Sequence, residues 1–74
     1  MVNKRVVREM ERLRLEEKDL ARILRLPIAI IRKKLKEEMP GFEQDYFIAG
    51  MRAEEEWLQE LSWRHRKWRK AGNR

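Results

Sequence analysis

The feature that most constrains this sequence is a short break, Arg25-Leu26-Pro27, between two stretches whose apolar residues have helical spacing. The spacing is i, i+1, i+4 before the break and i, i+3, i+7 after it, and both patterns place apolar side chains on one helix face. The two faces are Leu20, Ala21 and Leu24, then Ile28, Ile31 and Leu35. Proline is favoured in the first turn of a helix, where its missing N–H costs nothing. The segment therefore predicts a helix over 16–25, a tight turn, and a helix over 28–38.

A further amphipathic helix is expected over residues 4–14. Its apolar residues Val6, Met10 and Leu13 stand at i, i+4 and i+7, which predicts one buried face. The residues expected to face outward are Arg5, Arg8, Glu9, Glu11 and Arg12. The alternation of Leu13-Arg14-Leu15 is also compatible with a short extended link. Three acids, Glu16, Glu17 and Asp19, then complement the dipole at the start of the next helix.

Met39-Pro40-Gly41 ends the third helix, because proline disfavours helical geometry at the residue before it. Residues 42–48 are compatible with a helix or a short strand, and Gly50 weakens both assignments. Residues 51–70 are expected to be helical. Apolar residues follow a heptad seam interrupted by Glu54 and His65, as in a coiled coil: they are Met51, Leu58, Leu61 and Trp68. We expect two segments, a core over 1–41 and a C-terminal helical segment over 42–74.

The composition favours an all-α fold. Charged residues make up 43% of the 74 residues, and Ala, Leu, Glu, Lys and Arg, which dominate, are good helix formers. The net charge of +6 is unevenly distributed. Residues 1–39 carry twelve Lys/Arg and seven acids, residues 40–61 one Arg and six acids, and residues 62–74 six Lys/Arg and no acid. The chain thus predicts a basic body, an acidic middle segment and a basic tail.

Several function classes lack the residues they need. The chain contains no Cys and no Thr, and His65 is its only histidine. No nucleophile–base pair, metal-ligand cluster or Gly-rich phosphate loop can be assembled from the pattern, so we expect no catalytic, metal or cofactor site. Glu54-Glu55-Glu56 is more typical of a solvated face than of an acid–base pair. No apolar run reaches the roughly 18–20 residues of a membrane span, and a cytoplasmic location is expected.

Residues 17–35 resemble the helix-turn-helix family, including its winged-helix branch. The matching positions are Leu20-Ala21, Leu24, Leu26, Ile31 and Leu35. The resemblance implies a three-helix core, completed by residues 4–14, and a small DNA-binding transcription regulator. Family members usually have Gly where this chain has Arg25, and Ser or Thr where it has Pro27. No wing is expected, since residues 42–48 offer only one β-prone run.

The resemblance implies that the third helix lies in the major groove. Arg32, Lys33 and Lys36 would then reach bases or phosphates, with Ile28 and Ala29 contacting thymine methyl groups. Phosphate anchoring is assigned to Arg22, Arg25, Lys34 and the basic tail. Ile28 and Ala29 stand where the family usually has polar base-reading residues. This difference supports an alternative use of the same fold.

In that alternative the unit docks on a protein. An exposed tip at Ile28, Ala29 and Ile30 would anchor in a groove of the partner. The N-terminal basic face, Arg5, Arg8 and Arg12, and the tail would add contacts. Small phage-encoded regulators that bind host RNA polymerase are similar in size, charge and helical content. That likeness implies RNA polymerase as the partner and the host cytoplasm as the location.

The basic tail interleaves aromatic rings with cations: Trp63, Arg64, Arg66, Lys67, Trp68, Arg69 and Lys70. Such a segment can neutralise phosphates and stack indoles on bases, including those of RNA. Alternatively, Trp57, Leu61 and Trp68 share a helix face and pack on the three-helix body. In a third interpretation the tail meets the acids at 54–56 of a second copy in an antiparallel homodimer, through surface ion pairs that are individually weak.

Overall fold

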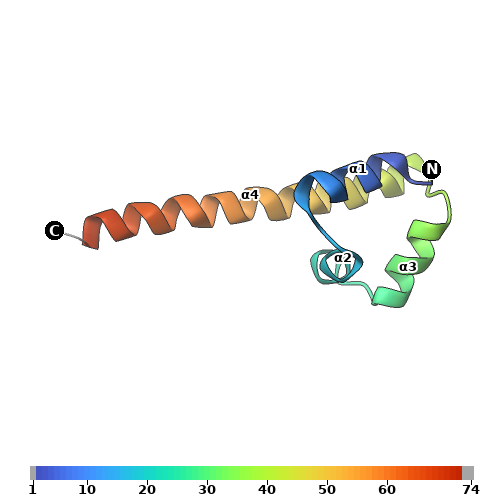
Figure 1. Ribbon diagram of the computed structural model, residues 1–74, viewed down its shortest axis with the longest axis horizontal. Coiled ribbons are helices and arrows are strands. Elements are labelled where there is room, and N and C mark those ends of the chain that lie inside the picture. Colours follow the sequence, from blue (N-terminus) through green and yellow to red (C-terminus); the bar gives the residue numbers. More distant parts are fainter. Residues whose placement is uncertain (1, 73–74) are drawn as a thin grey trace.

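A computed structural model describes the backbone of residues 2–72 and the side chains of residues 2–63. It contains four helices, α1 (Lys4–Leu13), α2 (Glu17–Leu24), α3 (Ile28–Lys36) and α4 (Gly41–Gly72) (Figure 1). No strand occurs among residues 2–72, so the all-α prediction is confirmed. Residues 42–48, which the sequence left open, are helical, and α4 runs from Gly41 through Gly50 without interruption.

The tripeptide Leu-Arg-Leu ends two of the helices in the same way. Arg14 and Arg25 have left-handed backbones, with φ of 57° and 56°. The next residue then donates its N–H back into the helix, from Leu15 to Met10 O at 2.9 Å and from Leu26 to Ala21 O at 3.1 Å. This is the Schellman arrangement, which usually places Gly at the left-handed position. Leu13-Arg14-Leu15 is therefore a helix end, and its interpretation as an extended link is wrong.

The helix starts follow the sequence signals closely. The Glu16 N–H donates to Asp19 Oδ2 at 2.7 Å, which fixes the first turn of α2. Pro27 lies just before α3, and its carbonyl accepts the N–H groups of Ile30 and Ile31 at 3.0 and 3.2 Å. α3 ends at Lys36 rather than at residue 38, because the chain becomes extended at Glu37.

Asn3 holds the end of α3 in place. Its side chain is fully buried, and Nδ2 donates to the carbonyls of Lys34, Leu35 and Glu37 at 3.0, 3.2 and 2.8 Å. Its Oδ1 accepts the Met39 N–H at 2.7 Å. A single amide thus satisfies three carbonyls and one N–H at a helix end where α3 offers no partners of its own. It also ties the start of α1 to the α3–α4 link.

The first half of α4 completes the core. α1 and α4 lie side by side and run in the same direction, since Arg5 meets Asp45 and Arg12 meets Glu55. α2 packs on α4, and α3 packs on α2, so that both lie on one side of this pair (Figure 1). The buried apolar residues are Val6, Leu20, Leu24, Ile31, Met39, Phe47, Ile48 and Met51. Segments 1–41 and 42–74 therefore share one core.

Gly50 lies where α4 approaches α2 closely. A Cβ atom at this position would stand 2.7 Å from Leu24 Cδ2. Gly50, which weakened the helix assignment, is therefore explained by the close approach of α2 and α4, which leaves no room for a side chain. Gly41, by contrast, has nothing within 4 Å of such an atom.

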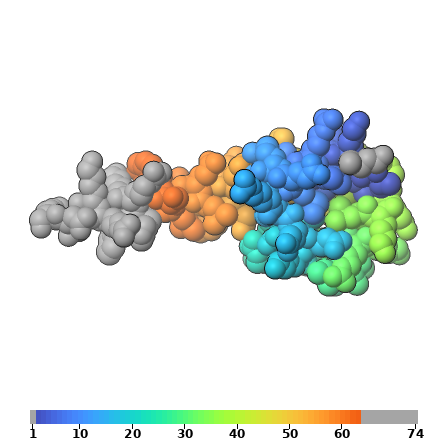
Figure 2. Space-filling model, viewed as in Figure 1, coloured from blue at the N-terminus to red at the C-terminus, as the bar shows by residue number. Residues whose placement is uncertain are grey.

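The second half of α4 leaves the body, which we define as α1, α2, α3 and residues 41–55 (Figures 1 and 2). The molecule accordingly measures 55 × 21 × 18 Å. Large apolar side chains on this half are exposed: Trp57 (55%), Leu58 (55%), Leu61 (41%) and Trp63 (54%). The interpretation that Trp57 and Leu61 pack on the body is therefore wrong, because α4 carries them past its edge. The side chain of Trp68 lies outside the described residues.

Candidate functional site

α2 and α3 pack against each other across a short turn, whereas α1 packs on α4, so the three-helix core implied by the resemblance is formed only with α4. Leu20, Leu24 and Ile31 are buried between the helices, and the left-handed Arg25 makes the turn compact. The opposite side of α3 is open to solvent. We call it the α3 face; its members are Ile28, Ala29, Arg32, Lys33 and Lys36, all exposed.

The cations predicted to bind DNA fall into two groups. Arg22 contacts Glu54 at 2.8 Å, Arg32 contacts Glu17 at 3.5 Å, and Lys34 contacts Glu43 at 2.7 Å. The neighbouring Glu54 raises the pKa of Arg22, chiefly through their hydrogen bond. The second group, Arg25, Lys33 and Lys36, is exposed and forms no salt bridge with any described side chain. These three are available to a ligand without breaking an existing pair.

The tip of α3 is apolar and exposed. Ile28 is 37% and Ile30 40% exposed, and Ala29 lies between them. Ile28 also borders a shallow hollow of about 440 Å³. The other residues that line this hollow are Met10, Glu16, Glu17, Lys18 and Arg32. The tip therefore joins an apolar contact area to a rim that carries both signs of charge.

The predicted N-terminal basic face is largely occupied by contacts to α4. Arg5 pairs with Asp45, and Arg12 contacts Glu55 at 3.1 Å. Of the three predicted arginines, Arg8 alone is exposed without a salt bridge among the described side chains. Arg5 and Arg12 therefore hold α1 against α4, a role that the sequence analysis did not assign to them.

Glu9 was expected to face outward, and this prediction is wrong. Its side chain is buried, and Arg12 Nε donates to Glu9 Oε1 at 2.7 Å, while Arg52 approaches Oε2 at 3.4 Å. The hydrogen bond from Arg12 lowers the pKa of Glu9, against the opposing effect of burial. Glu55 and Glu9 in turn raise the pKa of Arg12. Charge pairing thus permits an acid inside the α1–α4 contact.

The basic tail lies mostly outside the described side chains. Trp63 is exposed, whereas Arg64, Arg66, Lys67, Trp68, Arg69 and Lys70 lie beyond the last side chain described. The backbone of α4 remains helical through Gly72. The tail residues are therefore assigned only to positions along a helix.

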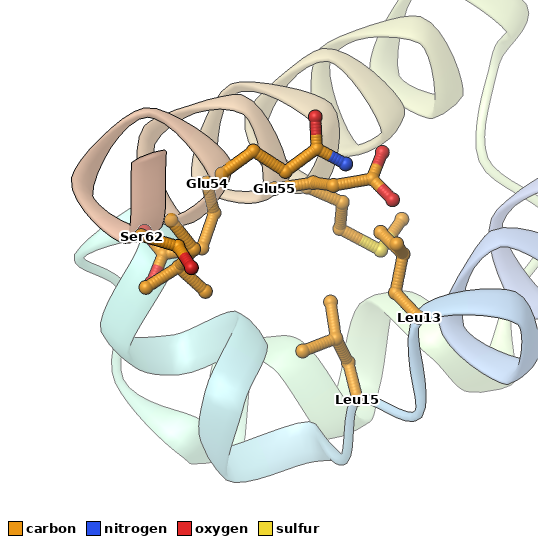
Figure 3. Close-up of a pocket in the computed structure, with 8 residues that line it drawn as sticks. Leu13, Leu15, Glu54, Glu55 and Ser62 are labelled. Atoms are coloured by element: carbon orange, nitrogen blue, oxygen red, sulfur yellow. The ribbon is translucent and has the colours of Figure 1, made fainter. Parts of the chain in front are cut away.

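A groove that the sequence analysis did not anticipate lies beside α4. Its volume is about 330 Å³, and we call it the side groove (Figure 3). It is lined by Leu13, Leu15, Met51, Glu54, Glu55, Leu58, Gln59 and Ser62. Leu13 and Leu15 point toward α4 across it. The two leucines of the α1 end thus supply one wall, and α4 supplies the other.

The residues that the structure describes contain no cluster of His, Cys, Asp and Glu able to hold a metal ion. None of the helices, over the part searched, combines the length and apolar content needed to cross a membrane. Comparisons with protein families, curated proteins and solved structures give no match.

Proposed function

We propose that this chain is a small transcription regulator that binds duplex DNA through the α3 face. The observation that carries the proposal is that Ala29, Lys33 and Lys36 are exposed together on the second helix of a helix-turn-helix unit. A helix presented in this way fits the major groove. Lysines without an acidic partner can bind phosphates directly.

The proposed contacts with DNA are of two kinds, those with phosphates, which position the protein, and those with base edges, which recognise the sequence. Lys33, Lys36 and Arg25 supply three cations for phosphates, and the small side chain of Ala29 permits close approach to base edges. Arg32 contributes after leaving Glu17, which lies 3.5 Å away in an exposed pair. Such a pair stabilises the free protein by no more than about 1 kcal/mol, so exchange for a phosphate is inexpensive.

Fluorescence anisotropy with a random-sequence duplex tests the proposal. Three phosphate contacts predict a roughly 40-fold loss of affinity between about 50 and 200 mM salt. Lys33→Glu should weaken binding about tenfold and flatten the salt dependence by about one unit of slope. Arg8→Glu makes the same charge change on α1, where Arg8 is exposed and outside the α3 face, and should have a much smaller effect. Absence of binding at 50 mM salt, or equal effects of both variants, rejects the proposal.

A second candidate function, docking on RNA polymerase, is supported by the exposed Ile28 and Ile30. Two aliphatic side chains at a helix tip are suited to a partner's apolar groove. A nuclease-treated pull-down with purified bacterial RNA polymerase tests this candidate. Ile28→Glu should abolish capture, while Phe42→Glu, at an exposed position on α4, should leave it intact. Capture that survives Ile28→Glu removes this surface from consideration.

A further inference from the structure

The half of α4 beyond the body carries an apolar strip made of Trp57, Leu58 and Leu61. At about 100° of rotation per residue, these three fall within about 100° of the helix circumference. All three are exposed. Trp63 falls on the opposite side of the helix and is not part of the strip. An apolar strip on a protruding helix is a typical contact surface for another helix.

The strip continues into the side groove. Leu58 belongs to both, and Met51, about two turns closer to the body, lines the groove with zero exposure. Leu13 and Leu15 form the far wall, and Glu54 and Glu55 add carboxylates beside the apolar lining (Figure 3). These two carboxylates already pair with Arg22 and Arg12, whereas Glu56, next along α4, is exposed and forms no salt bridge with any described side chain. The surface therefore favours an occupant that combines apolar side chains with a cation.

The tail of the same sequence has that composition, with Trp68 among Arg66, Lys67 and Arg69. It cannot reach the groove of its own chain, because the backbone of α4 stays helical through Gly72 and runs away from the body (Figure 1). A second copy can deliver it. The occupant that satisfies both the chemistry and the geometry is therefore another molecule of this chain.

We infer that α4 pairs with α4 of a second copy, antiparallel and centred on Leu61, so that each tail covers the partner copy's side groove. Around this centre, a residue n positions after Leu61 lies opposite the residue n positions before it. Trp68 then stands opposite Glu54, at the groove. Arg66 stands opposite Glu56, which forms no salt bridge with any described side chain, and Lys67 stands opposite Glu55, which it would share with Arg12.

A parallel pair lacks this match. It would place Glu54, Glu55 and Glu56 beside their own copies and the basic tail beside itself, so that like charges repel along the whole contact. The antiparallel pair is also closed by a two-fold axis, which limits assembly to a dimer. The strip and groove bury on the order of 1,000 Å² in total, given about 150–250 Å² for each aromatic side chain. That area is at the low end for specific contacts and predicts a concentration-dependent dimer.

Sedimentation velocity on the full chain from about 1 μM to 1 mM tests the inference. The mass should rise with concentration from 9.2 kDa toward twice that value. Leu61→Glu places two carboxylates at the two-fold axis and should weaken association more than tenfold. Trp63→Glu introduces the same charge on the other side of α4 and should leave association unchanged. A monomer at 1 mM, or equal effects of the two variants, overturns the inference.

Cross-linking tests the direction of pairing, because the chain has no cysteine of its own. In the antiparallel register Leu61→Cys faces its own copy and should form a disulfide. His65→Cys should not, since the two sulfurs would be displaced by about 12 Å along the axis. If both variants cross-link, the pair is parallel, and if neither cross-links, the copies meet through another surface. In a separate measurement, a chain that stays monomeric and changes its tryptophan emission only when RNA is added would assign the strip to nucleic acid. Each of these three outcomes rejects the proposal. The inference does not depend on DNA binding by the α3 face.

Discussion

The two halves of α4 are stabilised in different ways. Residues 41–55 bury Phe47, Ile48 and Met51 in the core, and their acids receive cations from each of the other three helices. Residues 56–63 continue the same helix with exposed tryptophans and leucines. The first half is therefore stabilised by tertiary packing. The second half inherits its helical start from the first, so that it avoids the cost of nucleation.

The salt bridges of the first half of α4 explain why an acidic segment follows a basic one in the sequence. The acidic segment supplies the partners of the basic body, with Glu54 bound to Arg22 and Glu55 to Arg12. The side chains of the basic tail beyond Trp63 lie outside the described residues. The proposed α4 dimer assigns their charge to the partner copy.

Met51→Ala and Leu58→Ala compare the two halves directly, since the two residues lie on the same side of α4. Met51 is fully buried, and its truncation should lower the free energy of unfolding by about 3 kcal/mol. Leu58→Ala should cost less than about 0.5 kcal/mol in dilute solution, where the chain is monomeric. Urea denaturation at low micromolar concentration measures both. Similar losses would show that the second half is also held by the body.

Asn3→Ala should reduce the stability of the body by about 2–3 kcal/mol, because it leaves buried carbonyls and an N–H without partners. Val2→Ala, next to it and exposed, should change stability by less than about 0.5 kcal/mol. Asn3→Ala should change the helicity of α4 beyond residue 55 only when the whole protein unfolds. Equal stabilities of the two variants would exclude Asn3 as the link between α1 and α3.

The sequence predicted α1, α2 and α3 because regular apolar spacing and two prolines are local signals. Asn3 and Glu9 could not be identified in that way. The partners of Asn3 lie 31 to 36 residues away, and Arg52 lies 43 residues from Glu9. From the sequence alone, Glu9 is assigned to the surface, because its neighbours in the helix are charged and its partner Arg52 is distant in the sequence.

The candidate site was predicted unevenly for the same reason. Exposure of Lys33 follows from helical periodicity. The same periodicity placed Ile28 on the apolar face with Ile31 and Leu35, whereas Ile28 is 37% exposed. The ion pairs of Arg22, Arg32 and Lys34 depend on how helices meet, and no local pattern contains that information. The side groove likewise arises only when Leu15 and Leu58, 43 positions apart in the sequence, line the same hollow.

Gly50→Ala and Gly41→Ala test the contact of α4 with α2. Alanine at residue 41 should stabilise the protein by up to about 1 kcal/mol, through helix propensity and reduced chain entropy. At residue 50 the new Cβ meets Leu24 at 2.7 Å, so a similar gain should be cancelled or reversed. Thermal unfolding followed by circular dichroism separates the two. An equal gain at both positions would show that Leu24 moves aside freely.

Glu9→Gln should remove part of the pH dependence of folding. Because the pKa of Glu9 is lowered in the folded state, its contribution is present above the unfolded value of about 4.3 and is lost as pH falls through the folded value. We expect a small contribution at neutral pH, since Arg12 and Arg52 are themselves largely in solvent. Denaturation between about pH 2 and 7 measures it. Glu11→Gln, at an exposed position, is the matched control.

The hydrogen bonds of the Asn3 amide delay the folding of α1 while the chain is being synthesised. Its acceptors and donor lie at residues 34–39, so α1 cannot be fastened until α3 has followed it from the ribosome. At about 5–20 residues per second, that interval is roughly 2–8 s. During this time α1 has neither its clasp nor its α4 partner. We therefore expect co-translational folding to wait for the first half of α4, and a nascent chain stalled before it should remain open to proteases.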